Sequence, residues 1–295
     1  MINLGIIGLS EGNGHPYSWS AIVNGYDYEK MKKCPFHSIP DYLSKESWPQ
    51  AMIANATISH IWTQDHLHSK EIADSCFIKN ICDNKEDMIG EIDGLLYARD
   101  DAQNNVKNCK PFLEASLPVY IDKPISFSID DLDLLLKFQK YNQQIFTCSA
   151  LKYAKEMYLS KDELVKLGKL KHIYCEVPKS WEKYAIHVLD PIFEQFSFLE
   201  IDDIKIIHDR TNAHKVSVKF RDNISAIFVA TNDIDTKIKI NYISKHINIE
   251  KHFYNPFDAF KTSISLFIDQ IINKKNHVNW SSVTKMIRII EEGYK

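Results

Sequence analysis

The sequence lacks the features that mark metal-binding, exported and membrane-spanning proteins. Its six cysteines form no C-x-x-C pair, so we expect no metal site. The first residues contain no basic stretch followed by a small-residue cleavage site. No apolar run reaches the ~18 residues typical of a transmembrane helix. We therefore expect a cytoplasmic protein with reduced thiols and no membrane partner.

An excess of charge of one sign is lacking as well. The 36 Lys and Arg against 39 Asp and Glu leave a net charge of −3. Such a chain has no broad basic field to attract nucleic acid, so we expect no nucleic-acid partner. Its 295 residues are enough for about two domains with sizeable cores.

The first half of the chain alternates short apolar runs with helical patterns. This alternation is typical of βαβ units and predicts a doubly wound, mainly parallel sheet of the Rossmann type. The predicted strands are 3–9, 34–39, 56–64, 91–98, 118–122 and 143–150, and the predicted helices are 17–26, 68–81, 102–116 and 129–142. Ligands bind outside the carboxyl ends of such strands, so the candidate site lies in the loops that follow them.

The pattern changes after about residue 150. Several runs alternate apolar and polar residues, as the strands of a half-exposed antiparallel sheet do. The predicted strands are 171–181, 203–209, 215–221, 224–231 and 236–250, and the predicted helices are 187–199, 258–273 and 282–294. We therefore expect a Rossmann domain over 1–124, extending to about 150, and an α+β domain over 151–295. The broad sheet face predicts a homodimer or homotetramer.

The stretch "GIIGLSEGNGHPYS" (5–18) places glycines between the first strand and the first helix. A helix N-terminus behind a glycine-rich loop binds phosphate well. The spacing does not follow G-x-G-x-x-G, however, and a purely structural turn is the alternative.

The triplet Asp122-Lys123-Pro124 follows the fifth strand. Proline fixes its own φ and biases the preceding lysine toward extended geometry, which would hold Lys123 at the mouth of a cleft. A lysine there can donate to a substrate hydroxyl or relay a proton, with Asp122 orienting it. The alternative is a surface lysine in a turn.

The stretch "WEKYAIHVLDPI" (181–192) is the third candidate. His187 and Asp190 are three residues apart, so they share one face of a helix. Following a strand of the second domain, His187 would face a cleft between the domains. A structural histidine is the alternative.

Together these pieces resemble the Gfo/Idh/MocA family of NAD(P)-dependent oxidoreductases, mostly in the order of elements. "DKP" looks like the family's E-K-P motif, and "AIHVLD" (185–190) is similar to the end of its D-x-G-x-H-x-x-D pattern. "YNPFDAFKTSISLFIDQI" (254–271) is like the family's penultimate helix. Three departures stand out: Lys183 takes the place of the family's first aspartate, Ala185 that of its glycine, and "ARDD" (98–101) that of a Thr-Pro turn.

The resemblance implies an enzyme that transfers a hydride between nicotinamide and a hydroxyl or keto carbon of a sugar, nucleotide-sugar or cyclitol, using NAD or NADP. The implied catalytic residues are Lys123, His187, Tyr184 and Asp190. The implied cofactor-binding residues are Gly8, Ser10, Glu11, Gly12, Asn13, Gly14, His15, Thr63, Gln64, Arg99, Asp122 and Lys123. The end of the predicted second strand, at His37 and Ser38, offers no acidic residue for a ribose, so the choice between NAD and NADP stays open.

A non-catalytic homologue that binds a nucleotide or sugar is the alternative function, because Lys183 replaces an aspartate.

Overall fold

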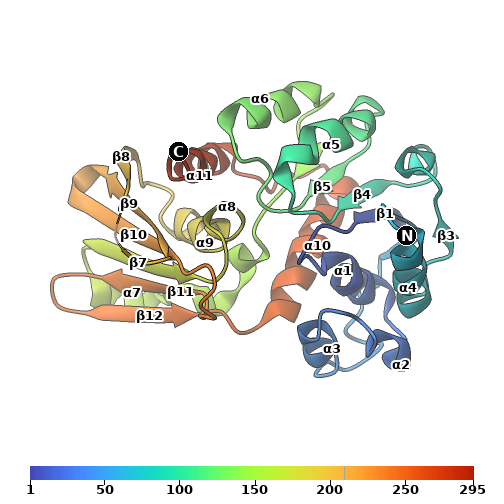
Figure 1. The fold of residues 1–295 in the computed structure, drawn as a ribbon, viewed down its shortest axis with the longest axis horizontal. Coiled ribbons are helices and arrows are strands. Elements are labelled where there is room, and N and C mark those ends of the chain that lie inside the picture. The colour runs from blue at the N-terminus through green and yellow to red at the C-terminus, as the bar shows by residue number, and fades with distance from the viewer. Residues whose placement is uncertain (209) are drawn as a thin grey trace. The chain divides into compact units, whose positions relative to one another are not determined.

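A computed structural model describes residues 1–208 and 210–295, and the chain divides into two compact units (Figure 1). The first unit comprises Met1–Ile125, Asp133–Thr147 and Phe260–Val278. The second comprises Ser126–Leu132, Cys148–Ala259 and Asn279–Lys295. Each unit holds one six-stranded sheet.

The sheet of the first unit is entirely parallel, with strand order β3-β2-β1-β4-β5-β6. Its strands are β1 (Ile2–Gly8), β2 (Ala56–Thr63), β3 (Asn80–Ile81), β4 (Gly94–Tyr97), β5 (Val119–Ile121) and β6 (Ile145–Phe146). Its helices are α1 (His15–Asn24), α2 (Tyr28–Met31), α3 (Ser38–Leu43), α4 (His66–Cys76) and α5 (Asn105–Glu114), with the short 3-10 helices η1 (Lys85–Met88) and η2 (Ala102–Asn104). Helices α6 (Ile129–Phe138) and α10 (Pro256–Asn273) each contain a boundary between the units.

The apolar sequence of β1 explains why this strand lies inside the sheet, between β2 and β4. The last five residues of the strand are buried, as expected for a parallel strand with both faces covered. Helices α1 and α4 pack against β2. From α10, the ring of Phe267 packs with those of Tyr120 and Phe146. A Cβ on Gly94 would meet Phe267 at 3.3 Å and Ile271 at 2.6 Å, so the close approach of α10 to β4 requires glycine there.

The prediction of a strand over 34–39 is wrong. This segment is a turn that leads into α3, and Phe36 and Ile39 pack against Gly14 at the start of α1. Their spacing of three residues is that of a helical turn and not of a strand. The strand beside β1 is therefore β2, which was predicted as the third strand. The two-residue β3 was predicted as the end of a helix, but α4 ends at Cys76 and Phe77 is left-handed with φ 57°.

The sheet of the second unit has strand order β12-β11-β7-β10-β9-β8. Only β7 and β10 pair in parallel, so the sheet is mixed and mostly antiparallel, as expected. Its strands are β7 (His172–Val177), β8 (Ile201–Ile206), β9 (His214–Phe220), β10 (Ile224–Ala230), β11 (Lys239–Ile243) and β12 (Asn248–His252). Its helices are α7 (Lys161–Leu167), α8 (Trp181–Tyr184), α9 (Ile186–Gln195) and α11 (Trp280–Glu292), with η3 (Ala150–Tyr153), η4 (Lys155–Met157) and η5 (Arg221–Asn223).

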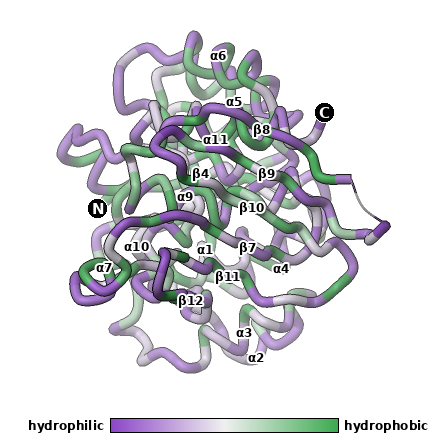
Figure 2. The backbone as a smooth tube through the Cα atoms, turned by 90° about the vertical axis from the view of Figure 1, so that its left-hand side faces the viewer, coloured by the Kyte–Doolittle hydropathy of each residue, from purple (hydrophilic) through white to green (hydrophobic). Residues whose placement is uncertain are grey.

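Apolar and polar residues alternate along the strands, which gives the second sheet one buried and one half-exposed face. In β9 the side chains of Val216, Val218 and Phe220 are buried, whereas Lys219 is exposed. Figure 2 shows hydrophilic and hydrophobic residues mixed along these strands. The run predicted as one strand over 236–250 is the antiparallel pair β11 and β12. Of the strand predicted over 203–209, residue 209 lies outside the described residues.

The structure also bears on metal and membrane binding. Among residues 1–208 and 210–295, no three His, Cys, Asp or Glu side chains gather in a way that would hold a metal ion. None of the described helices is both long enough and apolar enough to cross a lipid bilayer.

Candidate functional site

The carboxyl ends of four neighbouring strands meet at one edge of the first sheet. Strands β2, β1, β4 and β5 are adjacent and parallel, so the loops that follow them lie side by side. The structure brings the predicted cofactor-binding residues together at this edge. They lie at or after the carboxyl ends of β1 (Gly8, Ser10, Glu11, Gly12, Asn13, Gly14, His15), β2 (Thr63, Gln64), β4 (Arg99) and β5 (Asp122, Lys123).

The glycines of the first loop serve different purposes. Gly12 has φ +74°, and a Cβ placed on it would meet nothing within 4 Å, so the loop is open at this point. A Cβ on Gly8 would lie 2.2 Å from Pro16, and one on Gly14 would lie 2.6 Å from Phe36. Gly8 and Gly14 are therefore required for internal packing, and Gly12 is the position where a ligand can approach the backbone.

The start of α1 is partly capped by the chain itself. The side-chain oxygen of Asn13 accepts the His15 N–H at 2.8 Å, and Pro16 has no N–H to offer. Fewer amides of the first turn are thus available to an anion than in an uncapped helix.

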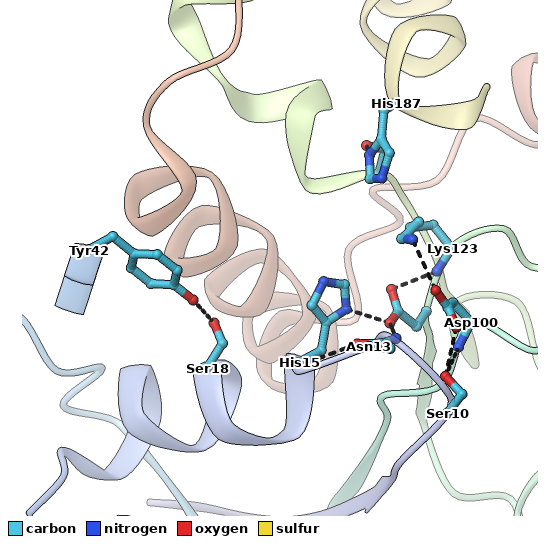
Figure 3. A network of polar contacts seen from close by, with 10 residues as sticks. Ser10, Asn13, His15, Ser18, Tyr42, Asp100, Lys123 and His187 are labelled. Carbon is cyan, nitrogen blue, oxygen red and sulfur yellow. Dashed lines mark hydrogen bonds and ion pairs between the residues drawn. The ribbon is translucent and has the colours of Figure 1, made fainter. Parts of the chain in front are cut away.

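Asp122 joins the first loop to the residue after β5. Its Oδ2 accepts from Asn13 Nδ2 at 2.9 Å and lies 2.5 Å from His15 Nδ1, and its Oδ1 accepts the Lys123 N–H at 2.7 Å. The side chain of Asp122 is only 2% exposed. The His15 ring stacks on Trp19, with 5.0 Å between ring centroids. Asp122 therefore fixes the backbone of Lys123 and the side chains of Asn13 and His15, the three residues that Figure 3 labels around it.

The partner of the Lys123 ammonium is Asp100, which the sequence did not single out. Lys123 Nζ lies 3.6 Å from Asp100 Oδ2, and both side chains are buried. Ser10 Oγ donates to Asp100 Oδ1 at 2.7 Å, and the Asp100 N–H donates back to Ser10 Oγ at 3.0 Å. We predicted that Asp122 orients Lys123. In the structure Asp122 contacts the backbone N–H of Lys123, whereas Asp100 forms the ion pair with its ammonium group. The only sequence signal was the doubled carboxylate in "ARDD".

Gln64 and Arg99 fix the beginning of the same loop. Gln64 Oε1 accepts the Leu9 N–H at 3.0 Å and a hydrogen bond from Arg99 Nη1 at 2.9 Å. Arg99 also donates to the Leu9 carbonyl and forms a two-point ion pair with Asp101. Thr63 instead bonds to Ser69 and to the Asp65 carbonyl, which places it at the start of α4.

The corrected strand order reveals a further acidic residue. Strand β2 lies next to β1 and ends at Thr63, so the position that contacts a ribose in dinucleotide-binding folds falls on Gln64 and Asp65. Asp65 is exposed, and its carboxylate accepts the Leu67 N–H at 2.8 Å. His37 does not occupy this position, because the segment 34–39 is not a strand of the sheet.

The remaining predicted catalytic residues belong to the second unit. His187 and Asp190 lie in α9, and both are buried. His187 Nδ1 is 2.9 Å from Ser149 Oγ, and Asp190 Oδ2 accepts the Ser149 N–H at 2.7 Å. Ser149, just before η3, thus contacts both predicted residues. The position of His187 is shown in Figure 3. No sequence pattern pointed to Ser149, because 38 residues separate it from His187.

An ion pair between the buried Lys152 and the exposed Glu194 lies beside Asp190. Burial raises the pKa of Asp190 to about 6, although Lys152 favours its charged form. Burial lowers the pKa of Lys152, but the carboxylates of Asp190 and Glu194 outweigh it, so the net shift is upward. Lys152 Nζ lies 3.0 Å from Glu194 Oε2.

Tyr184 lies one helical turn before His187. The centroids of their rings are 5.1 Å apart, and Lys179 Nζ lies 5.0 Å from the centre of the Tyr184 ring. Lys183, at the position of the family's first aspartate, is half-buried in α8.

Comparison with known proteins gives matches among solved structures alone. No protein-family model matches the chain, and no curated protein does. The structure of scyllo-inositol dehydrogenase from Lactobacillus casei with bound NAD(H) and scyllo-inositol is similar, with TM-score 0.69 and 14% identity over 99% of this chain and 95% of that one. Myo-inositol 2-dehydrogenase from Lactobacillus plantarum gives TM-score 0.72 and 12% identity over 98% and 95%. UDP-N-acetylglucosamine 3-dehydrogenase from Acidithiobacillus ferrooxidans gives TM-score 0.70 and 10% identity over 98% and 95%. The fold expected from the resemblance is confirmed: the chain has the fold of these dehydrogenases.

Proposed function

We propose that this protein is an NAD(P)-dependent oxidoreductase that transfers a hydride between nicotinamide and a hydroxyl or keto carbon of a sugar, nucleotide-sugar or cyclitol. The observation that carries the proposal is Lys123. This buried lysine follows β5, is held by Asp100, and shares a sheet edge with the open loop at Gly12. Solved structures with this fold include dehydrogenases of inositols and of a nucleotide-sugar, which supports the substrate class.

The residues at the edge of the first sheet fit a dinucleotide. The backbone is open at Gly12, where a pyrophosphate would approach between β1 and α1. Asn13 and Pro16 reduce the number of N–H groups that the first turn of α1 can offer to a pyrophosphate. We therefore expect the backbone N–H groups of residues 11–12 to contribute more to its binding than those of the helix. Asp65 follows β2, where a carboxylate binds the ribose hydroxyls and repels a 2′-phosphate. We therefore propose that NAD is preferred over NADP.

Each predicted catalytic residue has a proposed role. Lys123 donates a hydrogen bond to the reacting oxygen and polarises it, while Asp100 and Asp122 hold its two ends. His187 accepts the hydroxyl proton during oxidation and returns it during reduction. Tyr184 packs beside His187, and Asp190 positions the backbone that contacts it. The nicotinamide, when bound, accepts or supplies the hydride.

Kinetics of variants test these roles. On a panel of inositols, sugars and nucleotide-sugars, Lys123→Met and His187→Asn should each lower kcat by about 10²–10⁴-fold, the range of general acid–base catalysis. If both side chains act on the same transition state, the double variant should lose much less than the product of the two effects. Lys107→Met, an exposed lysine of α5, is the control and should retain full activity.

A non-catalytic binding homologue remains the alternative, favoured by Lys183 at the position of an aspartate. Saturable binding of cofactor and sugar, with no turnover of any compound in the panel, would support it. Full activity of both single variants on a confirmed substrate would contradict the catalytic assignment.

A further inference from the structure

The contact between Ser149 and His187 has no counterpart in the motifs that suggested the function. Ser149 Oγ lies 2.9 Å from His187 Nδ1, and the serine is completely buried. In the family pattern an aspartate precedes the histidine by four residues, but here that position is Lys183. The hydroxyl that lies at the hydrogen-bonding position of Nδ1 comes from Ser149, the residue before η3 in the second unit.

The hydrogen bonds of Ser149 indicate which atom carries the proton. A hydroxyl has one proton and two lone pairs. The Leu151 N–H donates to Ser149 Oγ at 3.3 Å, which uses one lone pair. Among the contacts of Ser149 with the described residues, the only acceptor for its fully buried hydroxyl proton is Nδ1, 2.9 Å away, so the proton is directed toward this atom. A neutral imidazole that accepts at Nδ1 carries its own proton on Nε2.

The backbone of Ser149 is fixed at both polar atoms. Its N–H donates to Asp190 Oδ2 at 2.7 Å, and its carbonyl accepts the Lys152 N–H at 3.0 Å. Because Asp190 is one turn after His187 in α9, the same helix holds the serine and presents the histidine. The hydroxyl position therefore follows from α9 and η3 together, and is not free to adjust.

We infer that Ser149 is a positioning residue that holds His187 as the Nε2–H tautomer. The inference rests on the proposed function only in giving His187 a role in proton transfer. A carboxylate partner can only accept, and it would place the proton on Nδ1. A hydroxyl that donates to Nδ1 instead leaves the ring proton on Nε2, which is then a hydrogen-bond donor. When His187 takes up a second proton at Nδ1, the hydroxyl oxygen can accept a hydrogen bond from it.

A spectroscopic experiment tests the tautomer without any substrate. Long-range proton–nitrogen correlation spectra of the full chain with ¹⁵N-labelled histidine, recorded at about pH 8.5 where a histidine of ordinary pKa is neutral, distinguish the two ring nitrogens. The chain has 12 histidines, and the signal lost in His187→Asn assigns this one. The expected result is a protonated Nε2 and an unprotonated Nδ1. A proton on Nδ1 would overturn the inference.

Substitutions of Ser149 give the second readout. Ser149→Thr should keep the wild-type tautomer, Ser149→Asp should move the proton to Nδ1, and Ser149→Ala should give a mixture. Ser263→Ala is the control: this buried hydroxyl donates to the Phe260 carbonyl of its own helix and should leave the His187 signals unchanged. A Ser149→Ala spectrum identical to the wild type would refute the positioning role. If that variant fails to fold, the wild-type and Thr spectra still decide the tautomer.

Kinetics separate this inference from the proposed function. Ser149→Ala should lower kcat about 10-fold or more, toward the lower end of the effect of losing an acid–base group, and change KM less than kcat. Ser149→Thr should restore kcat. If the protein turns over no substrate, the proposed function fails but the tautomer measurement stands. If it is active and Ser149→Ala leaves kcat unchanged, the inference fails alone.

Discussion

The buried ion pair between Lys123 and Asp100 allows a prediction of stability as well as of activity. Asp100→Asn keeps the shape of the side chain and an oxygen to accept from Ser10, but it removes the negative charge. At 3.6 Å and an effective dielectric constant of about 20, two unit charges attract by about 4–5 kcal/mol. Removing one partner of a buried pair typically costs about 3–5 kcal/mol, because the other charge is left uncompensated. We expect Asp100→Asn to lower the free energy of unfolding by about this amount.

Urea unfolding of four proteins measures this directly. The wild type, Asp100→Asn, Lys123→Met and the double variant form a cycle in which the double variant should recover part of the stability lost in the single variants. The matched control is the pair between Lys110 and Glu114 in α5, whose atoms are 3.8 Å apart and whose side chains are half exposed. Glu114→Gln should cost less than about 1 kcal/mol.

Two results would refute the reasoning. One is a loss in Asp100→Asn no larger than in the surface control. The other is simple additivity in the double variant, which would mean that the two charges do not stabilise one another.

Four further predictions concern other parts of the chain. Asp65→Ser should raise the ratio of kcat/KM for NADP over NAD by at least tenfold, because it removes the carboxylate after β2; an unchanged ratio in steady-state assays would contradict this role. Asp190 has a folded-state pKa of about 6, above the unfolded value of about 3.9, so its contribution to stability is lost as pH rises from 4 to 6, by up to about 3 kcal/mol. Urea unfolding at several pH values between 4 and 6 measures this loss of unfolding free energy, and the loss should be smaller in Asp190→Asn. An equal loss in that variant would exclude Asp190 as its source. Gly12→Val should weaken cofactor binding and, because φ is +74°, destabilise the fold by about 1 kcal/mol or more in the same unfolding assay; unchanged affinity would show that the open backbone there is not a binding position. Light scattering should give two or four times 34.3 kDa, since the broad second sheet predicts a homodimer or homotetramer, and a monomer at micromolar concentration would contradict it.

Much of the fold was predictable because the apolar patterns are strong. The run "NLGIIGL" and the alternation in "KVSVKF" specify a buried strand and a half-exposed one, and both are found. The error at 34–39 came from a segment where Phe36 and Ile39 have helical spacing but too few residues to show a period. Strand β3 was missed because it forms only two residues of pairing with β2.

The candidate site was predictable only where the chain itself marks it. Lys123 is marked by the proline after a strand, and His187 and Asp190 by their helical spacing. Asp100 and Ser149 contact residues that are 23 and 38 positions away in the chain, so only the packing of separate elements reveals them. Asp65 became visible once the sheet order showed which strand lies beside β1.

The most direct test of the proposed function is a fluorescence titration of the purified protein with NADH and, separately, with NADPH. Trp19 belongs to α1, packs on His15 and lies next to the loop that would hold the cofactor, so energy transfer to the reduced nicotinamide should report binding. We predict saturable micromolar binding of NADH, weaker binding of NADPH, and weakened binding of both in Gly12→Val. A folded protein that binds neither would contradict the assignment of the first unit as a dinucleotide site, and with it the proposed oxidoreductase.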